Sequence, residues 1–247
     1  MDVRNEVIDK LVISGCSWSL GEMSLREDNF LHKSHPGMTE YLNYKTVNLS
    51  TANGSNWQSL YKVWIYLTVN KKVDSSCCVI IFQTDFARSA VSEEFGVDYA
   101  DILENCINLQ HFYTQLAEIF YIKIAELSAT YNVPIYIVGA LSDVDKELFS
   151  LYNSVNNVIC NSWIKLLYNE HTPSLIPCGL DSTYIDIARL ANRKDLSIEM
   201  IEHSDSVFTH FGNMLELDTF GPTFGDFHPS REGHKIIANK INNFFEE

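Results

Sequence analysis

The sequence predicts an α/β fold in which a parallel β-sheet is covered by helices on both faces. Short apolar runs alternate along the chain with longer segments whose apolar residues recur every three or four positions. The 247 residues suit one large α/β domain, and a composition of 46% hydrophobic and 20% charged residues is that of a globular protein. No repeat, low-complexity stretch or linker divides the chain. We therefore expect a single domain spanning residues 1–247.

The first half of the chain predicts three strands and one helix. The apolar run LVISG at 11–15 stops at a glycine, as a buried strand does before a tight turn. Residues 16–34 are expected to form a turn and a loop. A second strand is expected at 46–49, and the periodic segment 57–69 predicts a helix. A third strand is expected at 78–82.

The second half begins with a long amphipathic helix. Apolar residues of 99–131 recur at helical spacing, and Pro134 ends the pattern. A fourth strand is expected at 135–140 and a helix at 144–152. Residues 158–168 fit either a fifth strand or a helix, which gives a sheet of about five strands.

Residues 170–225 are mixed in pattern and rich in loop-forming residues. Within them a helix is expected at 181–193, and a final helix is expected at 231–245. In parallel sheets ligands gather at the carboxyl ends of the strands. The motifs that follow strands are therefore the candidates for function.

The charge of the chain argues against some partners. Its formal net charge of −14 would repel nucleic acid and anionic membranes, so we expect neither as a partner. The N-terminus carries acidic residues where a signal peptide would be basic, and it has no apolar segment of sufficient length. We expect a cytoplasmic protein, and a virus particle assembled there fits equally well.

The cysteines and histidines predict no cofactor and no metal site. The six cysteines are scattered without a CxxC pair, which is typical of free thiols in a reducing compartment. Two of the histidine pairings, His32 with His35 and His228 with His234, lack a matched carboxylate cluster, so a metal-dependent hydrolase is a distant alternative. The sequence does not indicate an oligomeric state.

The first motif with chemical potential is GCSWS, residues 15–19, directly after the first strand. A serine on the tight turn that leaves a strand has an exposed hydroxyl, with backbone N–H groups nearby to hold an oxyanion. Ser17 is the candidate nucleophile, and it needs a histidine base elsewhere in the chain. Small-residue turns that contain serine are also common as purely structural features.

The second motif, DFHPS at 226–230, precedes the last helix. In an extended segment Asp226 and His228 project to the same side, so the carboxylate could orient the imidazole while its other nitrogen faces Ser17. The same segment could also cap the final helix through Ser230. Capping and catalysis are compatible.

Two further motifs could bind the substrate. In NLSTANGSN (48–56), Gly54 permits close backbone approach and could present its N–H to a substrate oxygen, and Asn56 adds a donor. After the third strand, Thr84 or Gln83 could donate to an oxyanion. Arg88 could pair with an acidic substrate group or with a neighbouring aspartate.

Taken in order, these segments resemble the SGNH/GDSL hydrolase family over almost the whole chain. GCSWS stands where the family has its nucleophile block, and NLSTANGSN stands where it has its glycine block. The segment VIIFQTD (79–85) is similar to the third block, and FGDFHPSREGH (224–234) is similar to the block with the catalytic Asp and His. The resemblance implies a flavodoxin-like three-layer α/β/α fold. It also implies that Ser17 is the nucleophile, with its own N–H as one oxyanion donor. Asp226 and His228 would be the other catalytic residues.

This sequence departs from the family pattern at three positions. Cys16 replaces the usual acidic residue beside the nucleophile, a change expected in divergent members that begin GCS. Thr84 stands where the third block normally has asparagine, and Asp226 lies two residues before His228 where three is usual. The loss of a side-chain oxyanion donor costs about 100- to 1000-fold in rate.

The leading functional hypothesis is a serine esterase that acts on a small acyl group, such as acetyl on a carbohydrate. The same acyl-enzyme could instead acylate a sugar or another alcohol. A third hypothesis is a binding or structural protein, such as one in a virus particle, that keeps the fold without catalysis. The α/β-hydrolase family fits less well because the chain contains no GxSxG. Substrate choice would depend on the loops expected at 20–45, 86–100 and 170–225.

Overall fold

The computed structural model describes residues 8–25, 31–52, 54–70, 76–84, 86, 109–163, 166–167, 208–210, 227–229 and 231–246. Within them a five-stranded parallel sheet has the order β4-β1-β5-β6-β7. The strands are β1 (Lys10–Ser14), β4 (Lys45–Asn48), β5 (Cys77–Gln83), β6 (Ile135–Gly139) and β7 (Val158–Cys160). This strand order is flavodoxin-like, and it confirms the predicted α/β fold class.

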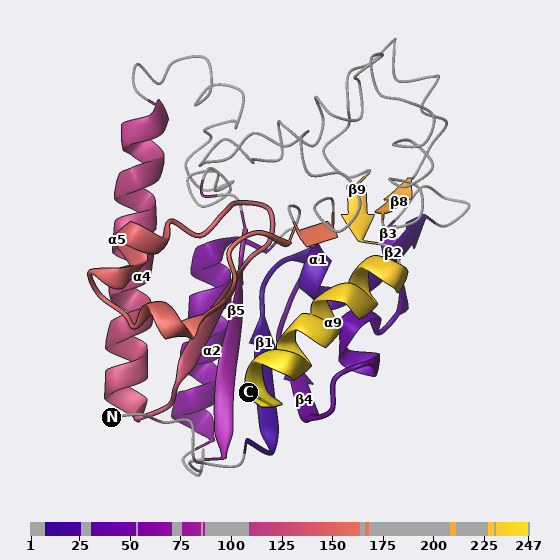
Figure 1. The fold of residues 1–247 in the computed structure, drawn as a ribbon, viewed down its shortest axis with the longest axis horizontal. Helices are drawn as coiled ribbons and strands as arrows, with labels where there is room; N and C mark the ends of the chain where they lie inside the picture. The colour runs from indigo at the N-terminus through magenta and orange to yellow at the C-terminus, as the bar shows by residue number, and fades with distance from the viewer. Residues whose placement is uncertain are drawn as a thin grey trace.

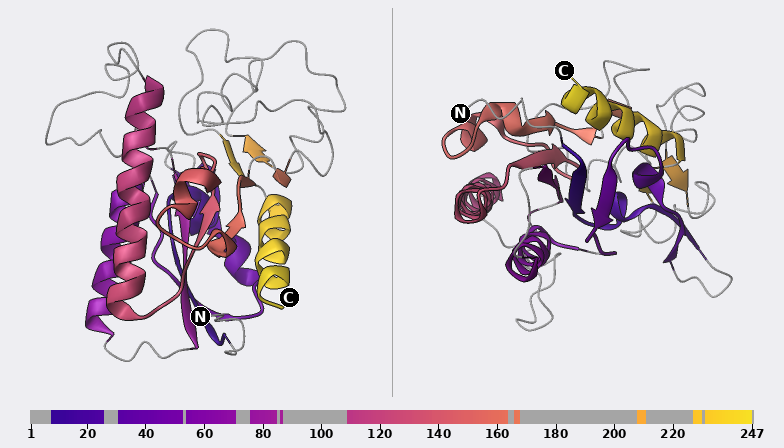
Figure 2. Two further views of the ribbon diagram at one scale, coloured as in Figure 1. Left: turned by 60° about the vertical axis from the view of Figure 1, so that its left-hand side comes forward. Right: turned by 90° about the horizontal axis from the view of Figure 1, so that it is seen from below.

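Helices cover both faces of this sheet. Helices α2 (Asn56–Val69) and α4 (Leu109–Tyr131) lie on one side, and α9 (Arg231–Glu246) lies on the other (Figure 2). A short helix, α5 (Lys146–Ser150), and two 3-10 turns, η2 (Gly37–Glu40) and η4 (Val155–Asn157), lie in the described connections. The three layers place the carboxyl ends of the strands at one edge, where α1 (Ser17–Leu20) follows β1 (Figure 1).

Alternating residues of the strands build two buried clusters. Ile13 of β1 and Ile80 of β5 pack with Ile237 of α9. Val12 and Ile81 point the other way and pack with α2 and α4. Because successive side chains of a strand face opposite sides, a sheet covered on both faces needs continuous apolar runs. Every residue of β5 is buried accordingly.

The expected elements of the sheet lie within a few residues of their predicted places. The undecided segment 158–168 begins with a strand, β7. The long helix predicted over 99–131 is seen as α4, whose first described residue is Leu109. Residues 99–108 and the helix predicted at 181–193 lie outside the described part of the chain.

Two regions expected to be loops contain strands. Residues 16–34 hold α1, β2 (Glu22–Leu25) and the start of β3 (Leu31–His35), and β2 and β3 pair antiparallel. Their sequences, EMSL and LHKSH, lack an apolar run. Strand β8 (Phe208–His210) lies within the loop-rich segment 170–225, and it pairs with β9 (Phe227–Pro229), which is extended. Three-residue strands are too short to produce a readable period.

Among the described residues, no helix combines the length and the apolar character that crossing a membrane requires. In the described part of the chain, Cys16, Cys77, Cys78 and Cys160 are buried thiols. Cys106 and Cys178 lie outside the described residues.

Candidate active site

The strand order places the first and third predicted motifs side by side. Strand β1 pairs with β4 on one side and β5 on the other. The chain therefore passes from β1 to β4 on one side of β1, and then through α2 to β5 on the opposite side, so the strand order reverses at β1. Ligands of doubly wound sheets bind at such a reversal of strand order, outside the carboxyl ends of the strands. Ser17 follows β1 and Thr84 follows β5 at this edge.

Ser17 is the first residue of α1, and it is 5% exposed. Cys16 is the N-cap residue, and its carbonyl accepts from the N–H groups of Ser19 and Leu20. The N–H groups of the first turn of a helix have no acceptor within the helix itself. Ser17 lies at the start of α1, which directly follows the carboxyl end of β1.

The glycine before this turn is required by packing. A Cβ on Gly15 would lie 2.3 Å from Ser19 Oγ and 2.7 Å from Phe82 Cβ. Real Cβ atoms essentially never come within 3.0 Å of other heavy atoms. The absence of a side chain at Gly15 thus allows the ends of β1 and β5 to approach each other.

The NLSTANGSN loop is joined to the Ser17 turn by several hydrogen bonds. The Thr51 N–H donates to Gly15 O at 3.2 Å, Ser50 Oγ and Ser19 Oγ are 2.9 Å apart, and Asn48 Nδ2 donates to Ser19 O at 2.8 Å. The predicted first and second motifs are therefore brought together.

Gly54 lies directly against Gly15, the glycine that precedes the Ser17 turn. A Cβ at this position would be 2.8 Å from Gly15 O, so only glycine fits without movement. Its N–H, which we expected to face a substrate oxygen, donates to Thr51 O at 3.1 Å. Close approach of two loops is the role that the structure gives this glycine.

Thr84 is completely buried at the end of β5, and its hydroxyl Oγ1 has no hydrogen-bond partner among the described residues. Its main chain is held firmly. The Thr84 N–H donates to Asn56 Oδ1 at 2.8 Å, and Thr84 O accepts from Asn56 Nδ2 and from Ser142 Oγ, each at 2.9 Å. The side chain of Asn56, expected to serve the substrate, is thus bonded to the third motif.

The amide of Gln83, the alternative oxyanion donor of the third motif, is already hydrogen-bonded inside the protein, which contradicts that role. Its Nε2 donates to Ser142 Oγ at 2.8 Å and to Asp143 O at 2.7 Å, while its Oε1 accepts from Tyr121 Oη at 2.9 Å. An amide nitrogen has only two hydrogens to donate. The side chain therefore links β5 to α4 and to the loop after β6.

The segment with the predicted base reaches the same edge of the sheet. The backbone of His228 lies in β9, opposite Thr209 of β8, and β9 contacts α1 (Figure 1). Asp226, Arg88 and the side chain of His228 lie outside the described part of the structure. The structure thus brings the backbone of the fourth motif to the helix that begins at Ser17.

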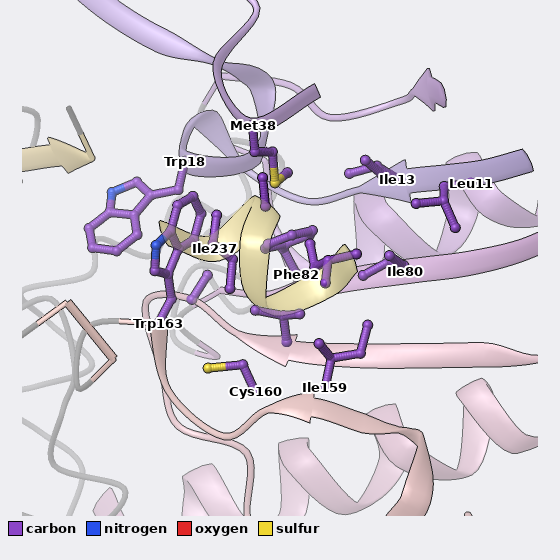
Figure 3. Packing of buried hydrophobic residues seen from close by; sticks show 14 of the residues in the cluster. Leu11, Ile13, Trp18, Met38, Ile80, Phe82, Ile159, Cys160, Trp163 and Ile237 are labelled. Carbon is purple, nitrogen blue, oxygen red and sulfur yellow. The ribbon is translucent and has the colours of Figure 1, made fainter. Parts of the chain in front are cut away.

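Aromatic packing beneath α1 connects it to α9, and the sequence did not predict this contact. Trp18 and Trp163 pack edge to face with ring centroids 5.6 Å apart, as Figure 3 shows. Trp163 also donates from Nε1 to Gly233 O at 3.3 Å and packs against His234. The tryptophan that follows Ser17 in the sequence was the available signal for this contact, but its partner, Trp163, is distant in sequence.

The described residues contain no cluster of histidine, cysteine and acidic side chains that could hold a metal ion. A hollow of about 460 Å³ lies between α2 and α4 and shares no residue with the motifs above. It is lined by Trp57, Leu60, Tyr61, Trp64, Lys123, Glu126, Leu127, Thr130 and Tyr131.

Comparison with known proteins finds likeness in structure alone. No family model matches the chain, and no curated protein matches it in sequence. A mutant of an acetyl-xylooligosaccharide esterase from Geobacillus stearothermophilus is 13% identical, with a TM-score of 0.45 over 99% of this chain and 97% of that one.

Two other solved structures are similar over nearly the full length. An α/β hydrolase from the metagenome of Lake Arreo is 13% identical, with a TM-score of 0.42 over 99% of this chain and 98% of that one. A lipolytic protein of the G-D-S-L family from Veillonella parvula is 14% identical, with a TM-score of 0.38 over 95% and 96%. The residues of the site, and not these distant likenesses, support the functional proposal.

Proposed function

We propose that the protein is a serine esterase of the SGNH/GDSL type, with Ser17 as nucleophile, His228 as base and Asp226 as the residue that orients the base. The observation that supports it most is the meeting of four separate chain segments at the switch point of the sheet. The Ser17 turn, the Gly54 loop, the end of β5 at Thr84 and β9 lie together there. Ligand sites of this fold class occupy that edge.

The proposed reaction passes through an acyl-enzyme. His228 takes the proton of Ser17 Oγ as this oxygen bonds to the ester carbonyl carbon, and the carbonyl oxygen becomes an oxyanion. His228 then gives that proton to the departing alkoxide as its bond to the carbon breaks. Water attacks the acyl-Ser17 carbonyl, His228 accepts the water proton and returns it to Ser17 Oγ, and the acid is released.

Two groups are proposed to bind the oxyanion. One is the Ser17 N–H in the first turn of α1. The other is the Thr84 hydroxyl, which is buried and without a hydrogen-bond partner among the described residues. Buried polar atoms are almost always hydrogen-bonded, so an unpartnered one calls for an explanation such as a ligand. Gly54 is assigned the close approach of the loops.

The proposed substrate is an ester of a small acyl group, such as an acetylated carbohydrate. The protein should hydrolyse p-nitrophenyl acetate, and Ser17→Ala should remove this activity. Ser150→Ala is the control, because Ser150 is an exposed serine of α5 that bonds to its own helix. Equal activity of wild type and Ser17→Ala would contradict the proposal.

Product analysis separates hydrolysis from acyl transfer. Free acetate released from an acetylated xylo-oligosaccharide, with no acetyl appearing on an added free oligosaccharide, supports the esterase. Acetyl transfer to the added sugar would instead identify an acyltransferase that uses the same acyl-enzyme.

A further inference from the structure

A continuous chain of hydrogen bonds, buried from Tyr121 onward, reaches Thr84 from helix α4. The Asp145 N–H donates to Tyr121 Oη at 3.2 Å, and Tyr121 Oη donates to Gln83 Oε1 at 2.9 Å. Gln83 Nε2 donates to Ser142 Oγ at 2.8 Å, and Ser142 Oγ donates to Thr84 O at 2.9 Å. Each of these residues therefore donates a hydrogen bond to the next one, from Asp145 to Thr84.

Asn56 closes this network from the opposite side. Its amide forms two hydrogen bonds with one residue, accepting from Thr84 N–H at 2.8 Å and donating to Thr84 O at 2.9 Å. Asn56 itself is fully buried. The Thr84 main chain is thus held at both its donor and its acceptor, by α2 on one side and by the loop after β6 on the other.

The start of helix α2 does not need the Asn56 side chain. Ser55 is the N-cap residue, and it forms a capping box with Gln58. Asn56 is the first residue inside the helix, where its side chain is available for another purpose. In the structure, the Asn56 side chain instead forms two hydrogen bonds with the Thr84 main chain.

A main chain held in this way also directs the Thr84 hydroxyl. Threonine is β-branched and has few χ1 rotamers, so fixing the backbone restricts where Oγ1 can point. The Thr84 N–H and O are both paired within the network, whereas Thr84 Oγ1 has no hydrogen-bond partner among the described residues. An oxyanion donor must be held in place before the reaction, because reorientation during the reaction costs rate.

We propose that Asn56 is a positioning residue that holds Thr84 through its main chain, so that the Thr84 hydroxyl is aimed at the oxyanion. This inference rests on the proposed function. The buried network from Tyr121 to Ser142 is proposed to hold the Thr84 main chain from the side opposite Asn56. Asn56 acts through Thr84 and need not contact the substrate.

The test is a double-mutant cycle on ester hydrolysis with Asn56→Ala and Thr84→Val. Asn56→Ala should lower kcat by about 10- to 100-fold and leave KM within about threefold, since a misplaced catalytic group reduces rate more than binding. In the Thr84→Val background the same change should lower kcat by less than about threefold, because the hydroxyl that Asn56 positions is already absent.

Asn157→Ala is the matched control. Asn157 Nδ2 donates to Ile135 O at 3.2 Å, so it also bonds a strand carbonyl, but at the start of β6, away from the site. Its kcat should stay within about twofold of wild type. Ser142→Ala removes the other bond to Thr84 O and serves as a second test if Asn56→Ala does not fold. It should lower kcat in wild type but not in Thr84→Val.

Wild-type kcat in Asn56→Ala, or losses that multiply in the double variant, would overturn the positioning role while leaving the esterase intact. A wild-type protein that neither hydrolyses esters nor reacts at Ser17 would instead overturn the proposed function, and the inference with it. Circular dichroism at the assay temperature identifies the variants that are folded.

Discussion

Gly15 and Phe82 are in such close contact that a Cβ on Gly15 would lie 2.7 Å from Phe82 Cβ. Gly15 directly follows β1, and Phe82 lies two residues before Thr84 in the neighbouring strand β5. The spacing between the proposed nucleophile and the proposed oxyanion hydroxyl therefore depends on a position that has no side chain.

Gly15→Ala should consequently reduce both stability and activity. The new methyl group would also lie 2.3 Å from Ser19 Oγ, so α1 and β5 would have to move apart. Overpacking of this kind costs about 1–3 kcal/mol. Urea denaturation should show the loss of stability, and the folded fraction should hydrolyse p-nitrophenyl acetate more slowly. Unchanged stability and rate would show that the close contact is absent in solution.

Thr84→Val should have opposite effects on activity and stability. Valine has nearly the same shape but no hydroxyl, so it removes a buried polar atom that has no partner among the described residues. We expect kcat to fall about 100-fold or more and thermal stability to stay the same or rise, because an unsatisfied buried hydroxyl costs about 1–3 kcal/mol.

The matched control for Thr84→Val is Thr68→Val. Thr68 Oγ1 donates to Trp64 O and bonds to Tyr131 Oη, each at 2.7 Å, on the exposed side of α2. This variant should lose a little stability and keep its activity. A Thr84→Val protein that is as active as wild type would remove Thr84 from the oxyanion site.

Stability should decline in alkali, in part because of Cys160. Burial raises the pKa of its thiol from 9.0 to about 11. The folded protein therefore retains a proton that the unfolded chain releases above pH 9, so this stabilisation is complete below pH 9 and is lost as the pH rises toward 11. Two pKa units correspond to about 3 kcal/mol at most.

Cys160→Ala should remove this dependence. The variant will be less stable at neutral pH because it leaves a cavity, but its free energy of unfolding should fall less steeply between pH 9 and 11. Urea titrations at pH 8, 10 and 11 measure the slope. Burial also raises the pKa of Cys78 and of Tyr121, so some alkaline sensitivity should remain. Parallel slopes for the two proteins would contradict the assignment to Cys160.

The sheet and its covering helices could be predicted from the sequence because burial leaves a pattern. Strands β1, β5 and β6 are buried on both faces and appear as apolar runs. The stripe of α4 repeats with the helical period over many residues. By contrast, strands β2, β3 and β9 are short, and their pairing partners are set by the fold rather than by local composition.

The candidate site was predictable to the level of the strand ends, but not to the level of atoms. Ser17 and Thr84 follow apolar runs, and parallel strands bring such positions to one edge. The sequence could not show that Asn56 would bond to Thr84 or that Gln83 would turn toward Tyr121. Those bonds join residues 28 and 38 positions apart. Amide side chains bond to whichever partner the tertiary structure supplies.

The most direct test of the central claim is reaction with a fluorophosphonate, followed by peptide mass spectrometry. The chain has buried serines near Ser17, including Ser14, Ser19 and Ser50, so locating the adduct separates an activated serine from its neighbours. We expect one adduct on Ser17, absent in Ser17→Ala and strongly reduced in His228→Ala. A folded wild-type protein that remains unmodified, or that is modified at another serine, would contradict the assignment of Ser17 as nucleophile.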